Sequence, residues 1–297
     1  MNTLLITGAA GVLGSELVRR YAEDPSVEIY ALSSNVKRFS EDFFKSPNIH
    51  LASNEDLFTG KLPVDSVDCL IHGAFARSAN GTELVSSITF TRKVFECAAG
   101  RVKKFVNISS QGVYGGHSPC NSSEDGPVNP CDLYAMAKRA CEELGDVILD
   151  NSGTSLTHIR LASLVGKRYM NHLLGKITRN ALENHLVKVA GGSQRFSFLH
   201  LDDAVSGIMA VAQGDAKYWQ RIYNVGTDDG ITLAEIAEAV AQTVSGKINK
   251  RIPVEFRESS DAHTISLDVS RMHRDFNWYA QKTLTDAIAE IIGSLQS

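Results

Sequence analysis

Short apolar runs alternate with amphipathic stretches along the first half of the chain. The apolar runs are rich in β-branched residues and predict strands, whereas apolar residues at three- and four-residue spacing between them predict helices. We predict strands at residues 3–6, 27–32, 69–72, 105–108 and 156–160. We predict helices at residues 14–22, 83–99 and 133–151. This alternation predicts an α/β fold built on a doubly wound parallel sheet.

The pattern becomes looser after Gly166. We expect a helix around residues 169–183, then the segment 188–198, then a helix that Asp202 or Asp203 caps. Residues 222–225 predict a strand, and residues 232–244 predict a helix capped by Thr232. Because no repeat or low-complexity linker divides the chain, we predict one domain at residues 1–165 and a smaller lobe at 166–297. Segments near 200–228 are expected to return to the first domain.

Composition and charge narrow the class of protein. The 297 residues carry a net charge of −4, which gives no signal for binding a polyanion such as nucleic acid. No apolar run approaches the roughly 20 residues that span a membrane. The chain enters a strand at once without a basic stretch or cleavage site, so we do not expect a secretory signal. Five scattered cysteines without a CxxC pair favour a reduced, cytoplasmic location and argue against a metal site.

A glycine-rich turn joins the first predicted strand to the first predicted helix. Gly8, Gly11 and Gly14 allow a tight turn, a close approach of the backbone to a diphosphate, and close packing of helix on strand. Val12 and Leu13 lie in this turn, and the free N–H groups at the start of the following helix can meet phosphate. Glycines also serve turns for steric reasons alone, but the position between strand and helix favours a dinucleotide site.

The end of the second strand indicates which dinucleotide binds. An Asp or Glu there would contact a free ribose 2′-hydroxyl, and the sequence has none. Ser33, Ser34, Lys37 and Arg38 stand there instead. Hydroxyls and cations suit a 2′-phosphate, so NADP is favoured over NAD; the alternative is a solvated loop that contacts neither.

Tyr134 and Lys138 lie four residues apart on a predicted helix and therefore share one face. An ammonium near a phenol, joined by the positive nicotinamide ring, favours phenolate and lowers the pKa of the tyrosine. Tyr134 then exchanges a proton at a substrate oxygen while hydride moves at the adjacent carbon, and the Ser110 hydroxyl holds the same oxygen. An exposed Tyr/Lys pair without function is the alternative, which the glycine turn upstream disfavours.

Several stretches together resemble a known family. They are TGAAGVLG, residues 70–76, KKFVNISSQGVYG, YAMAK, residues 194–203, residues 223–226 and LDVSRMHRDFNW. With these, the chain resembles the extended short-chain dehydrogenase/reductase family, in its nucleotide-sugar epimerase/dehydratase branch. The resemblance implies a Rossmann-type dinucleotide-binding domain with a smaller C-terminal substrate-binding lobe. It implies Ser110, Tyr134 and Lys138 as the catalytic trio, and places Ala74 and Ser109 beside the cofactor.

Departures from the family pattern restrict the chemistry. In the 4,6-dehydratases of the family an Asp-Glu pair follows the catalytic hydroxyl residue, and here Gln111 and Gly112 stand in its place. Neither can act as an acid or base, so we do not expect dehydration. Ser163-Leu164 replaces a frequent Asn-Pro, and Ser87 replaces a frequent Asn. Gln111 and Ser163 are the residues expected at the substrate there.

The resemblance also implies an anion site for the substrate. Arg195 matches the arginine that reaches the diphosphate of a sugar nucleotide, and Arg257 with Asp261 resembles an Arg-x-Gly-Asp element with one added residue and no Gly. A guanidinium suits a diphosphate because it donates two parallel hydrogen bonds. Surface arginines without a ligand are the alternative. His72 and His200 are interpreted as core or strand-end residues and not as metal ligands.

The leading hypothesis is an enzyme that transfers hydride at a carbon of a nucleotide-linked sugar, with a 4-ketoreductase slightly favoured over a 4-epimerase. Two alternatives remain: a reductase of small non-sugar carbonyl compounds, and a non-catalytic dinucleotide sensor. By resemblance we expect a homodimer paired through the helices at 83–99 and 133–151. On the second helix, apolar residues recur at three- and four-residue spacing and form a stripe that either faces the sheet or joins the dimer: Leu133, Ala137, Ala140, Leu144 and Val147 or Ile148. A dimer also needs apolar residues that point outward, and the candidates are Met136, Val85 and Thr89.

Overall fold

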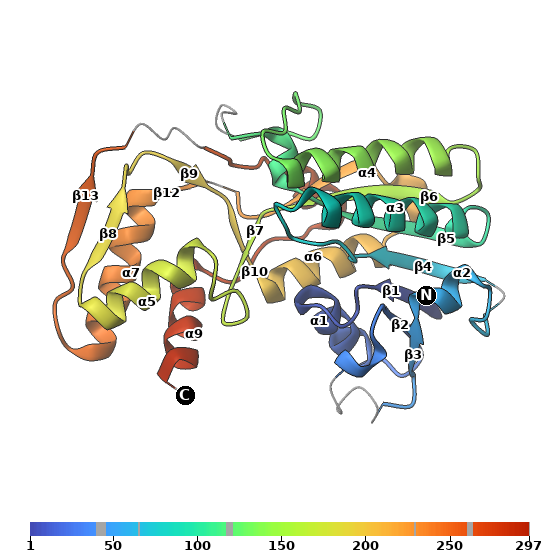
Figure 1. Ribbon diagram of the computed structural model, residues 1–297, viewed down its shortest axis with the longest axis horizontal. Coiled ribbons are helices and arrows are strands. Elements are labelled where there is room, and N and C mark those ends of the chain that lie inside the picture. Colours follow the sequence, from blue (N-terminus) through green and yellow to red (C-terminus); the bar gives the residue numbers. More distant parts are fainter. Residues whose placement is uncertain (40–45, 65, 117–120, 229, 260–263, 297) are drawn as a thin grey trace. The chain divides into compact units, whose positions relative to one another are not determined.

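The computed structural model describes residues 1–39, 46–64, 66–116, 121–228, 230–259 and 264–296 (Figure 1). The chain divides into two compact units. The first contains Met1–Val113, Pro130–Arg160 and Ile208–Tyr223, and the second contains Tyr114–Asn129, Leu161–Gly207 and Asn224–Ser297. The predicted boundary near residue 165, and the roles given to the two domains, stay predictions.

A sheet of seven strands organises the described part of the first unit, in the order β11-β6-β5-β4-β1-β2-β3. The pairs β1–β2, β2–β3, β1–β4 and β4–β5 are parallel. Strand β1 lies between β2 and β4 in the sheet. The order of the strands along the chain therefore reverses between β1 and β4, and the carboxyl ends of these two strands lie side by side there. The strands are β1 Thr3–Thr7, β2 Glu28–Ser33, β3 Ile49–Ser53, β4 Val67–His72, β5 Val102–Ser110, β6 Ser155–Leu161 and β11 Ile222–Val225.

Both faces of this sheet are buried, as the continuous apolar runs predict. Leu4 and Leu5 point to opposite faces of β1 because side chains alternate along a strand, yet both are buried. Leu5 belongs to a core with Val94 and Phe95 of α3 (Gly81–Ala98) and Leu149 of α4 (Leu133–Leu149). Helices α1 (Val12–Tyr21) and α2 (Asn54–Phe58) also belong to this unit.

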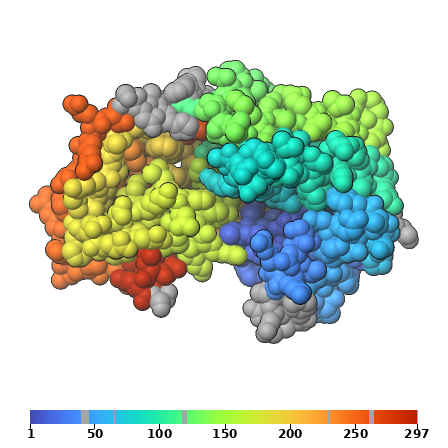
Figure 2. Space-filling view, viewed as in Figure 1, coloured from blue at the N-terminus to red at the C-terminus, as the bar shows by residue number. Residues whose placement is uncertain are grey.

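Helices α3 and α4 pack against each other (Figure 1) and lie side by side on the surface of the first unit (Figure 2). The close approach depends on Gly145, where a Cβ would lie 2.7 Å from the ring of Phe95. The expected inward stripe on α4 divides: Ala137 is buried, whereas Leu133 and Val147 are exposed. Two faces of α4 therefore carry apolar side chains.

The second unit has its own core of helices and a short strand pair. Three helices and β8 surround buried aliphatic residues that include Ile177, Val240 and Ile291. The elements are α5 Leu173–Asn184, β8 Val187–Ala190, α7 Leu233–Ile248, β13 Val254–Arg257, α8 Ser270–Phe276 and α9 Leu284–Gln296. Three small pairs complete it: β7 Ser163–Val165 with β10 Phe198–His200, β9 Arg195–Phe196 with β12 Ile231–Thr232, and β8 with β13.

Two predictions on the second half need correction. The helix expected from residue 169 begins only at Leu173, because residues 169–172 form turns. Helix α6 runs Leu201–Gln213, so Asp202 and Asp203 lie inside its first turn and do not cap it. Asp203 instead accepts a hydrogen bond from the backbone N–H of Lys282 at 2.8 Å. The cap at Thr232 is confirmed, since its side chain accepts from the N–H of Glu235.

Candidate active site

The glycine turn after β1 is a closely packed cradle. Gly8 has φ +72°, and a Cβ there would lie 2.8 Å from the backbone of Ala74, which follows β4. A Cβ on Gly14 would collide with the backbone of Gly8 and Ala9. Gly11 is the N-cap of α1 and brings no side chain to the first-turn N–H groups. The start of α1, with Val12 and Leu13, can therefore meet an anion.

The end of β2 presents one buried and several exposed polar residues. Ser33 is buried, and its hydroxyl donates to the carbonyl of Asn35 at 3.1 Å while it accepts from the N–H of the same residue. Ser34, Lys37 and Arg38 are exposed. The hydroxyl of Ser33 thus closes the turn, and Ser34, Lys37 and Arg38 are the members of the predicted set that face solvent.

A groove of about 400 Å³ lies in the first unit, at the carboxyl ends of β2, β3 and β4. Its lining runs from Ser34 after β2 and Asn54 after β3 to the segment 74–76 after β4, with α3 as the opposite wall. The side-chain oxygen of Asn54 is buried and has no hydrogen-bond partner among the described residues. Sequence reasoning missed Asn54 because it missed β3, the strand whose end places it.

The Tyr134/Lys138 pair lies at the start of α4, which Asp132 caps by accepting from the N–H of Ala135 at 2.8 Å. The Lys138 ammonium donates to the carbonyl oxygen of Ile108 in β5 at 2.7 Å. It lies 4.1 Å from the ring centre of Phe75 and 5.9 Å from that of Tyr134. Phe75 packs edge-on against Tyr134, with ring centres 5.9 Å apart, and it also lines the groove. The pair therefore adjoins the groove, and neither residue is a bare surface charge.

Burial dominates the charge states of this pair. It lowers the pKa of Lys138 to about 8, against the opposing effects of Cys141 and Glu142. Burial raises the pKa of Tyr134, while Arg77 lowers it and Asp132 raises it. In the protein by itself the pKa of Tyr134 is therefore raised, and the expectation that Lys138 and the nicotinamide ring together lower it stays a prediction. Sequence reasoning gave no role to Phe75, although it lies in the 70–76 stretch that carries the resemblance, and it passed over Arg77 just beyond that stretch.

Ser109 and Ser110 end β5 and point to opposite faces. Ser110 is half-buried, and its hydroxyl accepts from the N–H of Gly112 at 3.1 Å. Ser109 is buried and donates to the Glu142 carboxylate at 2.5 Å, so its hydroxyl is turned into the interior. Gln111 is buried in the short 3-10 helix η3 (Gln111–Tyr114) that follows. The Ser110 hydroxyl therefore lies at the carboxyl end of β5, close in sequence to Ile108, whose carbonyl accepts from the Lys138 ammonium.

Three of the candidate substrate residues, Ser163, Arg195 and Arg257, lie in the second unit, whereas Gln111 belongs to the first. Arg195 is half-buried and donates to the carbonyl of Gly230 at 2.7 Å. Arg257 is exposed at the end of β13, and within the described residues no contact joins the two arginines. Ser163 is half-buried in β7, and its N–H bonds the carbonyl of Ser197. Asp261 lies outside the described residues.

His72 at the end of β4 is enclosed by hydroxyls. Its ring nitrogens bond Thr7 at 2.7 Å and Thr91 at 2.9 Å. Burial lowers its pKa to about 3, so it is neutral and structural, as its position at a strand end indicates. Among the described residues, no group of three or more His, Cys, Asp and Glu side chains is placed to hold a metal ion. Nor does any described helix have both the length and the apolar character to cross a membrane.

Comparison with known proteins defines the family. The model of the NAD dependent epimerase/dehydratase family matches residues 4–226. The UDP-glucose 4-epimerase of Mycolicibacterium smegmatis is 29% identical over 317 residues, covering 97% of this chain and 96% of that protein. A dTDP-glucose 4,6-dehydratase of Streptomyces griseus is 26% identical over 308 residues, covering 97% and 92%.

The fold has similar solved structures as well. The UDP-glucuronic acid 4-epimerase of Bacillus cereus, in complex with UDP-glucuronic acid and NAD, matches with a TM-score of 0.83 over 99% of both chains, at 20% identity. This likeness concerns the fold, a Rossmann-like α/β arrangement. From the family model, the chain belongs to the NAD dependent epimerase/dehydratase family.

Proposed function

We propose that this protein is an enzyme that transfers a hydride at a carbon of a nucleotide-linked sugar, with a nicotinamide dinucleotide as cofactor and Tyr134 as the acid/base. The observation that carries the proposal is the cluster of Tyr134, Lys138 and Phe75 beside the groove at the carboxyl ends of the strands. Ser110 follows two residues after Ile108, whose carbonyl Lys138 bonds. Crevices at that edge are where open α/β sheets bind ligands.

The chain fits a dinucleotide. A Cβ at Gly8 or Gly14 would fill the cradle, and the uncapped start of α1 suits a diphosphate. Ser34 and Arg38 are exposed beside a strand end without a carboxylate, which supports NADP over NAD. The bound cofactor supplies or accepts the hydride. We assign cofactor contacts to Gly8, Gly11, Val12, Leu13, Gly14, Ser34, Arg38 and Ala74, and to Tyr134 and Lys138 at the nicotinamide end.

The residues of the chain handle the proton. Tyr134 stays protonated at neutral pH because burial raises its pKa, so it can donate to a carbonyl oxygen that gains a hydride at carbon. Ser110 holds the same oxygen with its hydroxyl. Lys138 is mostly an ammonium below pH 8 and stabilises the phenolate that remains after donation. Each of these steps is reversible, which an epimerase also requires.

The substrate class rests on the family and on the second unit. The names of the similar proteins include a UDP-glucose 4-epimerase and an enzyme bound to UDP-glucuronic acid. Arg195 and Arg257 are our candidates for the diphosphate of such a sugar nucleotide, with Asp261 on its ribose. Gln111 and Ser163 are our candidates for the sugar. A small non-sugar carbonyl substrate needs none of these cations.

Two reactions remain after dehydration is set aside, because Gln111 and Gly112 carry no carboxylate. A 4-ketoreductase is our first choice, since the strand end without an acid suits a dissociable NADP. A 4-epimerase is the second candidate, favoured by the names of the relatives. Tightly held NAD(H) in the purified protein would favour the epimerase, and its absence with NADPH consumption would favour the reductase.

A thermal-shift screen tests the substrate class. The ligands are NAD, NADP and a panel of UDP-, GDP-, CDP- and dTDP-sugars, because a ligand that binds only the native state raises the melting temperature. We expect a shift with one dinucleotide and a further shift with one nucleotide sugar. A shift with the dinucleotide alone, together with reduction of small ketones, would contradict the sugar assignment. Binding without any turnover would instead support a non-catalytic sensor.

We further propose a cytoplasmic homodimer. Leu133, Met136 and Val147 on α4 and Val85 on α3 are large apolar side chains exposed on neighbouring helices. Exposed apolar groups that gather on one face are typical of an interface. In the family that this chain resembles, dimers pair through these two helices.

A further inference from the structure

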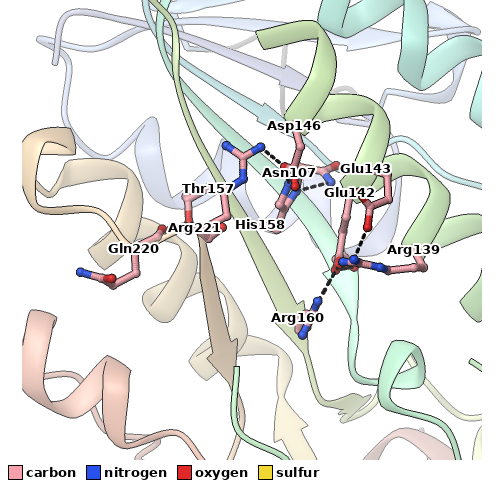
Figure 3. Close-up of polar contacts among 11 residues, drawn as sticks. Asn107, Arg139, Glu142, Glu143, Asp146, Thr157, His158, Arg160, Gln220 and Arg221 are labelled. Carbon is pink, nitrogen blue, oxygen red and sulfur yellow. Dashed lines mark hydrogen bonds and ion pairs between the residues drawn. The ribbon is translucent and has the colours of Figure 1, made fainter. Parts of the chain in front are cut away.

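Helix α4 carries a third polar residue on the face that holds the proposed acid/base pair. Tyr134, Lys138 and Glu142 follow one another at four-residue spacing, so each lies one turn beyond the last. The Glu142 side chain is fully buried, in a polar cluster that Figure 3 shows between α4 and the sheet. The proposed reaction uses the first two residues and leaves the third without a role.

The partners of Glu142 come from three elements. Ser109 in β5 donates to its carboxylate at 2.5 Å. Arg160 in β6 donates from Nε at 3.0 Å and from Nη2 at 2.8 Å, and Arg139 on α4 donates at 2.8 Å. Burial by itself raises the pKa of Glu142, but the hydrogen bonds and charge of Arg160 outweigh it and lower the pKa to about 2. Glu142 is therefore a carboxylate at every working pH.

These bonds fasten the end of β5 to two successive turns of α4. The Lys138 ammonium holds the carbonyl of Ile108, and the Glu142 carboxylate holds the hydroxyl of Ser109. The next residue is Ser110, whose hydroxyl we place on the substrate oxygen. The distance between Ser110 and the Tyr134/Lys138 pair therefore depends on both bonds. Small errors in such a distance are costly, since a misplacement of about 1 Å can slow a reaction by about 10²-fold.

Glu142 also determines the charge around Lys138. The ionisable groups that face this ammonium are Tyr134, Cys141 and Glu142 on α4 and His72 at the end of β4. Tyr134 and Cys141 are neutral at pH 7 because burial raises the pKa of each, and His72 is neutral because burial lowers its pKa. Among the described residues, Glu142 is the group in this set that carries a negative charge.

We propose that Glu142 is a positioning residue of the reaction centre, which fastens the Ser109–Ser110 end of β5 to α4 and places a carboxylate one helical turn beyond the Lys138 ammonium. The inference rests on the proposed function, and its test is read separately from turnover. The competing explanation is a buried ion pair with Arg160 that only stabilises the fold, or even costs stability.

The test compares three variants with the wild-type protein. Glu142→Gln keeps the shape of the side chain and removes its charge. Glu143→Gln is the matched control, because Glu143 is the adjacent glutamate, also pairs with Arg139, and is 56% exposed. The double variant Glu142→Gln with Arg160→Met also removes the buried positive charge that the loss of the Glu142 carboxylate leaves uncompensated and that unfolds the single variant if it costs too much. The pH titration of Lys138 is followed by NMR of lysine labelled at Cε, with the resonance assigned through Lys138→Arg.

We expect the midpoint of the Lys138 titration to fall by about one pH unit in Glu142→Gln, since one opposite charge is lost. The double variant should show a smaller shift in the same direction, because it also loses the nearby positive charge of Arg160, and Glu143→Gln should match the wild type. With a nucleotide sugar that turns over, kcat should fall at least about tenfold in both Glu142 variants. The alkaline limb of the pH–rate profile should also move to lower pH in both.

An unchanged Lys138 midpoint in folded Glu142→Gln would overturn the inference, whatever the rates. If that variant does not fold, the double variant decides: a wild-type midpoint and rate there would show that the pair is structural only. The proposed function fails in a different way, through a wild-type protein that turns over no nucleotide sugar. The Lys138 titration still reports on Glu142 in that case.

Discussion

At the scale of the residue, burial governs the proposed chemistry. Lys138 has a pKa of about 8, well below that of an exposed lysine, because its ammonium is removed from water. Its charge is therefore complete below pH 7 and is lost as the pH rises through 8. Tyr134 has a raised pKa and keeps its proton over the same range. The protein by itself is set up to donate a proton to a substrate.

This arrangement predicts how the rate depends on pH. The wild-type rate of reduction should fall as the pH rises through about 8, when Lys138 loses its proton. In Lys138→Ala the rate should be lower by about 10²-fold or more, dinucleotide affinity should weaken, and the alkaline limb near pH 8 should disappear. Steady-state rates from pH 6 to about 9.5 measure this. The same limb in the variant would mean that another group titrates there.

The end of β2 makes a second prediction at this scale. Arg38→Ala should weaken NADP binding by about tenfold, the worth of a hydrogen bond to a charged group, and should leave NAD binding unchanged. NAD serves as the internal control because it lacks the 2′-phosphate. Isothermal titration of both dinucleotides measures the effect. Equal losses for the two, or tighter NAD binding by the wild type, would contradict the preference for NADP.

Sequence reasoning identified the residues whose roles depend on local spacing. The Tyr134/Lys138 pair and the glycine turn each lie within a few consecutive residues, so their spacing alone predicts which of their side chains lie close together. Phe75 in the loop after β4 and Asn54 at the start of α2 line the groove, and only the packing of the sheet brings them there. Packing also places Arg77 near enough to Tyr134 to lower the pKa of its phenol. The same holds for Ser33. Its hydroxyl is visible in the sequence, but the hydrogen bond that this hydroxyl donates to the carbonyl of Asn35 is not.

At the scale of the element, α4 carries the proposed site. Asp132 caps this helix two residues before Tyr134 and accepts from the N–H of Ala135. Asp132→Ala should lower the free energy of unfolding by about 1 kcal/mol, the usual cost of losing an N-cap. Asp150→Ala at the other end of the helix is the control and should cost no stability, because a carboxylate there opposes the helix dipole. Denaturant titrations compare the two, and equal effects would contradict the capping role.

The elements that the sequence missed are short, or lie far along the chain. Strand β3 has five half-buried residues, so it lacks the buried apolar run that marked β1 and β4. Helix α9 buries Ala287, Ile288, Ile291 and Ile292 at helical spacing, and the periodicity was there to find. Strands β9 and β12 have two residues each and exist only as a tertiary pair, which no local pattern predicts.

At the scale of the whole molecule, the exposed apolar residues of α3 and α4 predict a dimer. Light scattering should give twice the mass of 32.3 kDa at micromolar concentration. Met136→Glu should give a single chain, because a carboxylate at the interface centre is desolvated without a partner. The control is Tyr218→Glu, which places the same carboxylate at another exposed large side chain, on η4 (Ala216–Tyr218); it should remain dimeric. One-chain mass for the wild type at every concentration would rule the dimer out.

The central claim is that Tyr134 exchanges the proton while hydride moves at a sugar carbon. The most direct measurement is the single-turnover rate of hydride transfer in Tyr134→Phe against the wild type, with the nucleotide sugar that the thermal-shift screen identifies. We predict a loss of about 10²–10⁴-fold with dinucleotide affinity within a few-fold of the wild type, since the ring and its packing on Phe75 remain. A variant that keeps more than about a tenth of the wild-type rate would show that another group supplies the proton.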